Sequence, residues 1–276
     1  MIMNKFHPLT ITSIARLTAD AVAISFDVSN NALFQFEAGQ YITIKQDING
    51  EEVRRAYSIC SMNAEGVTIG VKKVEDGRMS TFLTESVKKG DVLNVMTPSG
   101  NFVIKGDNKH IVGICAGSGV TPIIAMIKTE LAKPSDAKFT LIYGNKRKDS
   151  SMFSEEIKQL QEENPERLKI HWAFSRERIA GTINGRLDKN TIQQLLNTFI
   201  PLKTADAYFV CGPGELIDNT NELLLLNNIN QKKINFERFT TVEKTDVADN
   251  DSDEIISNVR VSVDGEDFEF TLSNKG

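Results

Sequence analysis

Two glycine-rich stretches of this sequence could bind a ligand through the main chain. The first, "GICAGSGVTPI" (residues 113–123), carries Gly117 and Gly119 between a strand pattern and a helix pattern. Small residues let a ligand approach the backbone, and the start of a helix presents N–H groups that suit an anion. Thr121 is expected to cap that helix, with Pro122 in its first turn. The stretch outlines a diphosphate cradle, although Pro122 replaces the third glycine of G-x-G-x-x-G and an ordinary turn is an equal alternative.

The second stretch, "YFVCGPGELI" (residues 208–217), repeats this arrangement. A buried strand pattern ends at Cys211 and Gly212, and a helix pattern follows. In an open parallel sheet, ligands bind at the carboxyl ends of the strands. Cys211 is therefore expected to face the same crevice as Gly117, while a structural role in the core is the alternative for an isolated cysteine.

A third strand pattern, "LKIHWAFS", is followed by arginines. Ser175 and Arg176 stand at its end, and Arg186 comes soon after. These residues could surround a phosphate group, because a guanidinium offers a fork of donors that fits it. An acidic residue at the strand end would instead read a ribose hydroxyl, and Glu177 leaves that option open. A solvated cluster of loop charges is the third interpretation.

The stretch "RRAYSICS" (residues 54–61) lies in the strand-rich first part of the chain. Arg55, Tyr57 and Ile59 are expected to share one face of a strand, because side chains alternate. Arg55 could hold a diphosphate while Tyr57 lies flat on a ring system. Ser58 points to the other face unless the strand twists or ends there. An edge strand with a surface tyrosine is the alternative.

A fifth stretch, "DGRMSTFL" (residues 76–83), is a turn that leads into a short helix. Its first N–H groups, near Met79, Ser80 and Thr81, could bind another phosphate. An ordinary capped helix explains the same residues.

The predicted secondary structure that must position these residues changes near residue 106. Up to residue 105, short strand patterns separated by turns predict a small antiparallel β-barrel with one short helix. From residue 106 to 240, strands alternate with helices, which predicts an α/β doubly wound parallel sheet. The sequence thus predicts two domains, 1–105 and 106–240.

Residues 241–276 differ in composition and pattern from the two predicted domains. Residues 241–256 are acidic and aperiodic, which is typical of a linker. Residues 257–276 read as two strands, Asn258 to Val263 and Glu266 to Leu272, around an Asp-Gly turn. Such a hairpin is barely stable alone. We therefore expect it to be the first part of a larger domain.

Composition narrows the function further. Among 276 residues, 40% are hydrophobic and the formal net charge is −5, which argues against nucleic acid as a partner. No apolar run suggests a membrane span, and the start lacks the features of a signal peptide, so a cytoplasmic location is expected. Cys60, Cys115 and Cys211 are far apart, so we expect free thiols and neither a disulfide nor a metal site.

Taken in order, these stretches resemble the motifs of the ferredoxin–NADP reductase family over about residues 5–240. "RAYS" and "GRMST" are similar to its two flavin motifs, "AGSGVTP" and "CGPGEL" to its two nicotinamide-nucleotide motifs, and "FERF" to its closing E-x-[FY]. The resemblance implies a flavin-binding barrel followed by a nucleotide-binding domain.

The resemblance also implies roles. Arg55 and Ser80, with the main chain at Met79 and Thr81, would bind the FAD diphosphate. Tyr57 would stack on the isoalloxazine, with Ser58 near its N5 atom. The residues that would meet NADPH, with NADH possible, are Gly117, Gly119, Thr121, Ser175, Arg176, Arg186, Cys211 and Gly212.

Catalytic roles are implied for Ser58, Cys211 and Glu237. Glu237 would lie at the flavin together with Phe239. Plant-type members of the family end on a tyrosine where this chain has Phe239 and continues.

The order of FAD, NAD(P) and a ferredoxin-like hairpin resembles reductases of multicomponent oxygenases, in particular those that serve phenylacetyl-CoA ring epoxidation. Hydride would pass from NADPH to FAD, and single electrons would reach an oxygenase or a ferredoxin-type acceptor through a [2Fe–2S] centre. The ligands of that centre follow the first hairpin in plant-type ferredoxins. No cysteine follows Cys211 here, so the chain is expected to be a truncated piece of such a reductase. A general NAD(P)H:ferredoxin or flavin reductase, and a binding module that has lost hydride transfer, are the competing interpretations.

Overall fold

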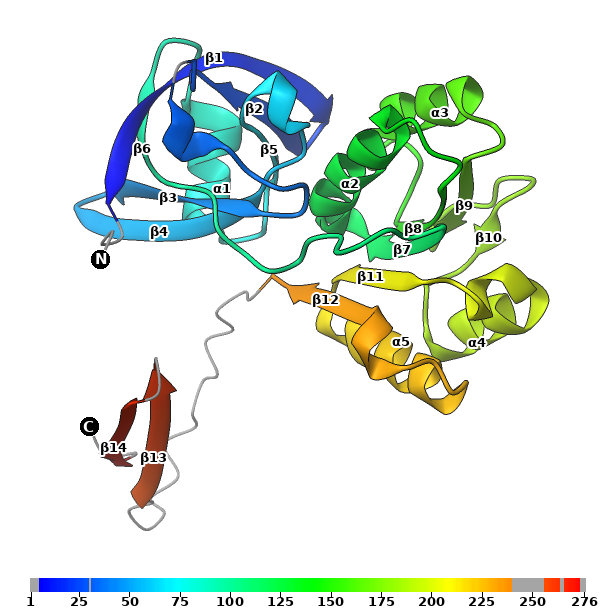
Figure 1. Cartoon of the computed structure of the whole chain (residues 1–276). Coiled ribbons are helices and arrows are strands. Elements are labelled where there is room, and N and C mark those ends of the chain that lie inside the picture. The colour runs from blue at the N-terminus through cyan, green and yellow to red at the C-terminus, as the bar shows by residue number, and fades with distance from the viewer. Residues whose placement is uncertain (1–4, 30, 240–255, 264–265, 274–276) are drawn as a thin grey trace. The chain divides into compact units, whose positions relative to one another are not determined.

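The computed structural model describes residues 5–29, 31–239, 256–263 and 266–273. Within these residues the chain forms two six-stranded sheets and a separate two-stranded hairpin (Figure 1). The chain divides into two compact units, Met1–Phe239 and Thr240–Gly276. No helix in the described ranges is long and apolar enough to cross a membrane.

The first sheet is antiparallel and has the strand order β4-β3-β6-β1-β2-β5. Long strand β1 pairs with β6 through its first half and with β2 through its second half, so the sheet curls. Its end strands approach each other through a bridge between Ile59 and Ile69, which closes the barrel. The strands are β1 (Phe6–Thr18), β2 (Ala21–Phe26), β3 (Tyr41–Ile48), β4 (Glu51–Ser58), β5 (Thr68–Lys72) and β6 (Val92–Met96).

A short helix covers part of the barrel core. Helix α1 (Arg78–Thr81) continues as a wider helical turn over residues 82–86. Its Met79 and Leu83 pack into the same cluster as Ile24 of β2 and Ile69 of β5. Alternation along the strands therefore buries one face inside the barrel, as the period-2 pattern predicted.

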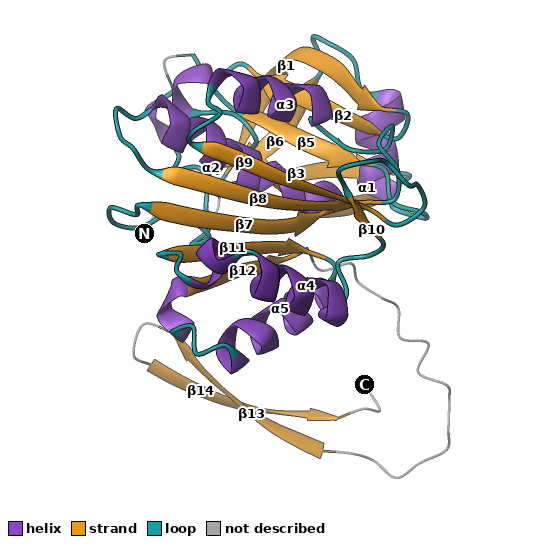
Figure 2. Cartoon of the chain, turned by 90° about the vertical axis from the view of Figure 1, so that its right-hand side faces the viewer, coloured by secondary structure: helices purple, strands orange, loops and turns teal. Residues whose placement is uncertain are grey.

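The second sheet is parallel and has the order β10-β9-β8-β7-β11-β12. Figure 2 shows helices on both of its faces. Its strands are β7 (His110–Ala116), β8 (Lys138–Asn145), β9 (Leu168–Phe174), β10 (Ile183–Asn184), β11 (Ala207–Gly212) and β12 (Ile234–Arg238). Its helices are α2 (Val120–Ala132), α3 (Ser154–Glu163), α4 (Lys189–Thr198) and α5 (Gly214–Leu226).

Each face of this sheet has its own core. Ile111 and Cys115 of β7 pack with α2 and α3, whereas Val112 and Ile114 pack with α4 and α5. Both faces are buried, which explains why the strands read as continuous apolar runs. The predicted fold class, an antiparallel barrel followed by a doubly wound α/β domain, is confirmed.

The barrel and the parallel sheet share a hydrophobic core. Phe102, which follows the barrel strands, meets Phe209 of β11 edge to face, with ring centres 5.3 Å apart. On the outward face of β5, a Cβ added to Gly70 would come within 2.5 Å of the Thr121 methyl carbon. Lys72 of β5 also donates to the Ser150 carbonyl at 2.9 Å. Close packing thus fixes α2 against the barrel.

The second unit contains strands β13 (Ile256–Val263) and β14 (Glu266–Ser273), paired antiparallel. The predicted Asp-Gly turn and nearly all of the predicted acidic linker lie outside the described residues. The assignment of this hairpin to a ferredoxin-like domain stays a prediction.

Candidate functional site

The predicted nucleotide cradle lies where the chain reverses direction across the parallel sheet. From β7 the chain adds β8 and β9 on one side and then returns to place β11 on the other. Ligands bind in such sheets beyond the carboxyl ends of the strands at this switch point. The loop after β7 and the end of β11 meet here, which brings Gly117, Gly119, Cys211 and Gly212 together.

Gly117 and Gly119 have different roles in this loop. Gly117 has a φ of +56°, and a Cβ added there would have no atom within 4 Å, so its backbone faces open space. A Cβ on Gly119 would lie 2.2 Å from the Cys211 carbonyl oxygen. Gly119 therefore lets the main chain of β11 pack against the loop, and its contact with NADPH stays a prediction.

Thr121 does not cap helix α2, contrary to the sequence prediction. A tight turn at residues 117–119 runs directly into the helix, which begins at Val120 with Gly119 as its cap. Thr121 is buried, and its hydroxyl donates back to the Ser118 carbonyl at 2.9 Å. Its side chain therefore stabilises the loop, and the Val120 N–H at the start of the helix donates within the turn, to the Gly117 and Ser118 carbonyls.

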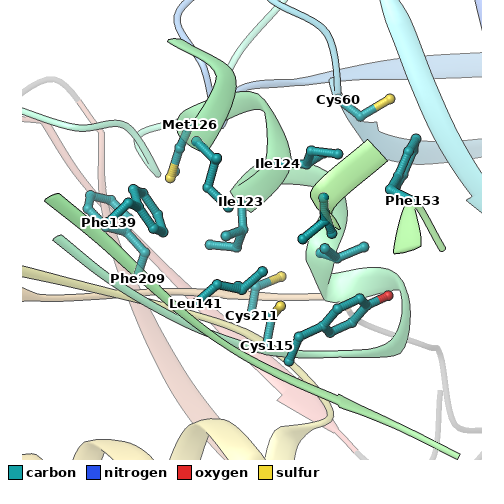
Figure 3. Close-up of a cluster of buried hydrophobic side chains, with 14 of the residues drawn as sticks. Cys60, Cys115, Ile123, Ile124, Met126, Phe139, Leu141, Phe153, Phe209 and Cys211 are labelled. Carbon is teal, nitrogen blue, oxygen red and sulfur yellow. The ribbon is translucent and has the colours of Figure 1, made fainter. Parts of the chain in front are cut away.

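Cys211 lies between two neighbours of the sheet, in register with Cys115 of β7 and Glu237 of β12. Figure 3 shows the two cysteines in an apolar cluster with Leu141 and Phe209. Burial raises the pKa of the Cys211 thiol well above its usual range, and the charge of Glu237 raises it further. Cys211 thus packs in the core with a protonated thiol while its carbonyl group borders the loop.

Ser58 and Glu237 connect the two domains. Ser58 ends strand β4 and is 2% exposed, and its hydroxyl donates to Glu237 Oε2 at 3.1 Å. Burial raises the pKa of the Glu237 carboxyl to about 7, against the hydrogen bond from Ser58, which lowers it. This carboxyl can therefore hold or release a proton near neutral pH, which suits a group that exchanges protons.

The strand before Ser58 carries Arg55 and Tyr57. Arg55 is exposed, and its Nη1 donates to the Arg54 carbonyl at 2.7 Å. Tyr57 is half-buried against the barrel core, and burial raises the pKa of its hydroxyl. Ile59 does not share their face: the strand ends at Ser58, and Ile59 is fully buried where it bridges to β5.

The second predicted flavin motif faces inward. Met79 packs in the barrel core, and the Ser80 hydroxyl donates to the Gly77 carbonyl at 3.0 Å while accepting from the Val74 N–H at 3.1 Å. The Thr81 N–H also donates to the Gly77 carbonyl, at 2.9 Å. These side chains fix the turn, so a phosphate contact here falls to the remaining main-chain N–H groups.

The predicted phosphate arginines, Arg176 and Arg186, follow the carboxyl ends of β9 and β10. The Ser175 N–H donates to the Asn145 carbonyl at 3.0 Å, and the Arg176 N–H donates to the Lys146 carbonyl at 2.9 Å. The two strand ends therefore continue side by side. The Arg176 side chain is exposed, and so is that of Arg186 after β10.

Sequence reasoning missed the cations of the neighbouring segment, "NKRK" after β8. Lys146, Arg147 and Lys148 stand beside Ser175 and Arg176 because parallel strands end at one edge. The order of the strands in the sheet would have predicted that these cations lie beside Arg176. The Glu177 carboxylate accepts from the Lys148 N–H at 2.8 Å, so it is engaged in holding this loop.

Phe239 follows β12, and its side chain is 40% exposed. Four predicted residues are successive neighbours in the structure. Ser58 donates to Glu237, Glu237 lies in register with Cys211, and the Cys211 carbonyl packs against Gly119. The residues that lie outside this series are Arg55, Tyr57, Ser175, Arg176, Arg186 and those of the second flavin motif.

Comparison with known proteins agrees with the two-domain fold. The Oxidoreductase FAD-binding domain family matches residues 8–104, and the Oxidoreductase NAD-binding domain family matches residues 114–222. The chain is 34% identical to one of the subunits of 1,2-phenylacetyl-CoA epoxidase from Escherichia coli (strain K12), over 98% of this chain and 78% of that protein. The chain belongs to the ferredoxin–NADP reductase family. It is an NAD(P)H-dependent flavin oxidoreductase.

Two further matches support the family and the fold. The ferredoxin reductase component of 3-ketosteroid-9-alpha-monooxygenase from Rhodococcus rhodochrous is 29% identical over 94% of this chain and 74% of that protein. The flavohem-like FAD/NAD-binding domain of nitric oxide dioxygenase from Vibrio cholerae O1 biovar El Tor superposes with a TM-score of 0.76 at 21% identity, over 85% of this chain and 99% of that chain. The latter likeness concerns the fold alone.

The described residues fit the two cofactors of the family. The open space at Gly117 and the only partial burial of Gly212 leave main chain accessible at the switch point, as a nucleotide diphosphate requires. The exposed Arg55 guanidinium offers donors for a second diphosphate, beside the partly accessible ring of Tyr57.

Proposed function

We propose that this protein transfers hydride from NADPH to FAD and then passes single electrons through a [2Fe–2S] centre to an oxygenase component, with phenylacetyl-CoA epoxidase as the first candidate. The hydrogen bond from Ser58 to Glu237 carries the first part of this proposal. It joins the end of the predicted flavin strand to the strand beside Cys211, at the switch point where a nicotinamide would bind.

Each residue then has a definable task. Arg55 would bind the FAD diphosphate, and Tyr57 would lie against the flavin ring. Ser58 would orient the flavin edge, while Glu237 would hold a proton within reach of Ser58. FAD, when bound, supplies the change from a two-electron donor to single-electron transfer. The protein's contribution is to place the two rings together and to exclude water.

Within the nucleotide domain, main-chain groups at Gly117 and Gly212 would face the NADPH diphosphate. Ser175, Arg176 and Arg186 would surround the 2′-phosphate, helped by the cations after β8. The hydrogen bond from the Lys148 N–H occupies one oxygen of the Glu177 carboxylate, and exposed cations surround it, which supports NADPH over NADH.

The partner assignment rests on the relatives. Two of them are named as part of an epoxidase and as the reductase component of a monooxygenase. The hairpin β13–β14 would open a ferredoxin-like domain, in which cysteine ligands of a [2Fe–2S] cluster follow the first hairpin. A cytoplasmic location remains part of this proposal.

An anaerobic titration tests the hydride step. The purified chain, loaded with FAD, is titrated with NADPH and separately with NADH while the visible flavin band is followed. Bleaching by NADPH at much lower concentration than by NADH is expected. Bleaching only by NADH would reject the nucleotide assignment, and no bleaching by either would reject the proposed reaction.

The partner is tested with the epoxidase oxygenase components and with the longest form of the chain. Phenylacetyl-CoA-dependent oxidation of NADPH is the expected result. If the longer form lacks an iron–sulfur spectrum and reduces free flavins instead, the general reductase alternative holds.

A further inference from the structure

A nearly buried lysine joins the barrel to two helices of the parallel-sheet domain. Lys128 Nζ on α2 lies 2.8 Å from Glu65 Oε2 and 3.1 Å from Glu156 Oε1 on α3. The side chain of Lys128 is 15% exposed, far below a typical surface lysine. Glu65 belongs to the barrel domain, so one of these two ion pairs crosses between the domains.

The segments that carry Lys128 and Glu65 both start at the proposed transfer site. Glu65 stands in the turn that follows Ser58, seven residues along the chain. Lys128 stands eight residues after Val120, the first residue of α2 behind the nucleotide loop. At 1.5 Å per residue this is about 12 Å along the helix. The ion pair therefore joins the two segments at a distance from the site.

The charged groups at this contact are held by partners within the protein. Glu65 Oε2 also accepts from the Met62 N–H at 2.9 Å, which holds the carboxylate in its own turn. Burial disfavours the charged form of Lys128, yet its pKa is raised because Glu65 and Glu156 outweigh burial. The pKa of Glu65 is likewise lowered, because Lys128 and Met62 together outweigh burial. Both groups are ionised near neutral pH, and a partly buried ion pair has a strict geometry.

We propose that Lys128 is a positioning residue for hydride transfer, because its ion pair with Glu65 holds α2 and the nucleotide loop at a fixed distance from the Ser58 end of β4. This inference rests on the proposed hydride step. Lys128 touches neither cofactor site and acts through the placement of the two domains. A shift of about 1 Å between reacting groups can slow a reaction by about 100-fold, so a contact far from the chemistry can set its rate.

Glu156 provides the matched control. Glu65→Gln and Glu156→Gln each remove one carboxylate charge from the same lysine, but Glu156 belongs to the same domain as Lys128. Lys128→Met removes both pairs at similar volume. Lys128→Arg keeps a cation that can reach both carboxylates.

Two measurements are made on these variants. In the FAD-loaded protein, the limiting rate of flavin reduction at saturating NADPH is separated from the Kd for NADPH by stopped flow. In the flavin-free protein, hydrogen exchange is followed over residues 59–66 and 120–132.

We expect Glu65→Gln and Lys128→Met to slow the limiting rate of flavin reduction by about tenfold with little change in the Kd for NADPH. Exchange should rise in both segments. Glu156→Gln should remain near the wild-type rate, and Lys128→Arg should recover most of it.

Equal limiting rates for Glu65→Gln and Glu156→Gln would overturn the inference, as would unchanged exchange in both segments of Glu65→Gln. If Lys128→Met fails to fold, the two glutamate variants still decide. If the wild-type flavin is reduced by neither nucleotide, the proposed function fails and this inference falls with it. If the wild type is reduced and only the contrast between the two glutamates is absent, this inference alone fails.

Discussion

The Ser58 hydroxyl donates a hydrogen bond of 3.1 Å to Glu237 Oε2, across the junction of the barrel and the parallel sheet. One residue ends a strand of the first domain, and the other lies in the last strand of the second. The bond can form only when both sheets are complete and docked. A proton held on Glu237 is therefore available only in the assembled site.

Glu237 should give the fold a pH dependence of defined sign. Burial raises the pKa of its carboxyl from 4.5 to about 7, so the folded state binds this proton more tightly than the unfolded state. The resulting stabilisation is fully present below about pH 4.5 and is lost as the pH rises through 7. By linkage it amounts to about 3 kcal/mol. Urea unfolding of flavin-free wild type and Glu237→Gln should show their free-energy difference changing by this order between pH 4.5 and 8.

The hydrogen bond supplies a control for this prediction. Ser58 lowers the pKa of Glu237, so Ser58→Ala should move the titration midpoint to higher pH. A wild type and a Glu237→Gln variant with parallel pH profiles would contradict the assignment of the titration to this carboxyl.

Gly117 and Gly119 should differ when each is replaced by alanine. The added methyl of Gly119→Ala meets the Cys211 carbonyl oxygen, a main-chain atom that cannot rotate away, and overpacking of this kind costs about 1–3 kcal/mol. Gly117→Ala meets no atom but is strained at a φ of +56°, which costs about 1 kcal/mol. We expect Gly119→Ala to lose more stability in denaturant unfolding.

The two variants should rank in the opposite order for nucleotide binding. Relative to the stability that each variant loses, Gly117→Ala should weaken NADPH binding more than Gly119→Ala. The methyl of Gly117→Ala would project into the space proposed for the NADPH diphosphate, so its Kd should rise while the fold stays largely intact. A Gly117→Ala variant with wild-type affinity would place the diphosphate elsewhere.

The three cysteines should resist thiol reagents in the folded chain. All are buried, and burial raises the pKa of each thiol, to about 12 for Cys60 and well above the usual range for Cys115 and Cys211. At pH 8 a thiol of that pKa is ionised in about one molecule in ten thousand, and the thiolate is the reactive form. Titration with a chromogenic disulfide should detect three thiols after denaturation. Rapid reaction of one native thiol that is lost in Cys211→Ser would show that Cys211 is accessible at the site.

Local patterns predicted the fold well because each strand and helix carries its own period. The apolar run "HIVGICA" could only be a strand buried on both faces, and β7 is the central partner of β8 and β11. The helix start at Thr121 was wrong for a local reason as well. Thr-Pro is a good capping pair, but the tight turn before it already has helical backbone and begins the helix at Val120.

Contacts between distant segments could not be predicted in this way. Nothing near Gly119 indicates that the Cys211 carbonyl will lie against it. The ion pair between Lys128 and Glu65 has no sequence pattern, since the partners come from different domains. The position of the cations after β8 beside Arg176 follows from the order of the strands, which no local pattern gives.

Arg176 should distinguish the two nicotinamide nucleotides. Its exposed guanidinium follows β9, beside the cations after β8, and NADPH differs from NADH by a charged 2′-phosphate. A hydrogen bond to a charged group contributes about 1.5–3 kcal/mol, so Arg176→Ala should weaken NADPH by about tenfold or more and leave NADH nearly unchanged. The Kd of each nucleotide is measured from rapid flavin reduction. Lys133→Ala is the control for net charge, because Lys133 pairs with Glu130 at the C-terminal end of α2. Equal losses for both nucleotides, or an equal effect of Lys133→Ala, would place the 2′-phosphate away from Arg176.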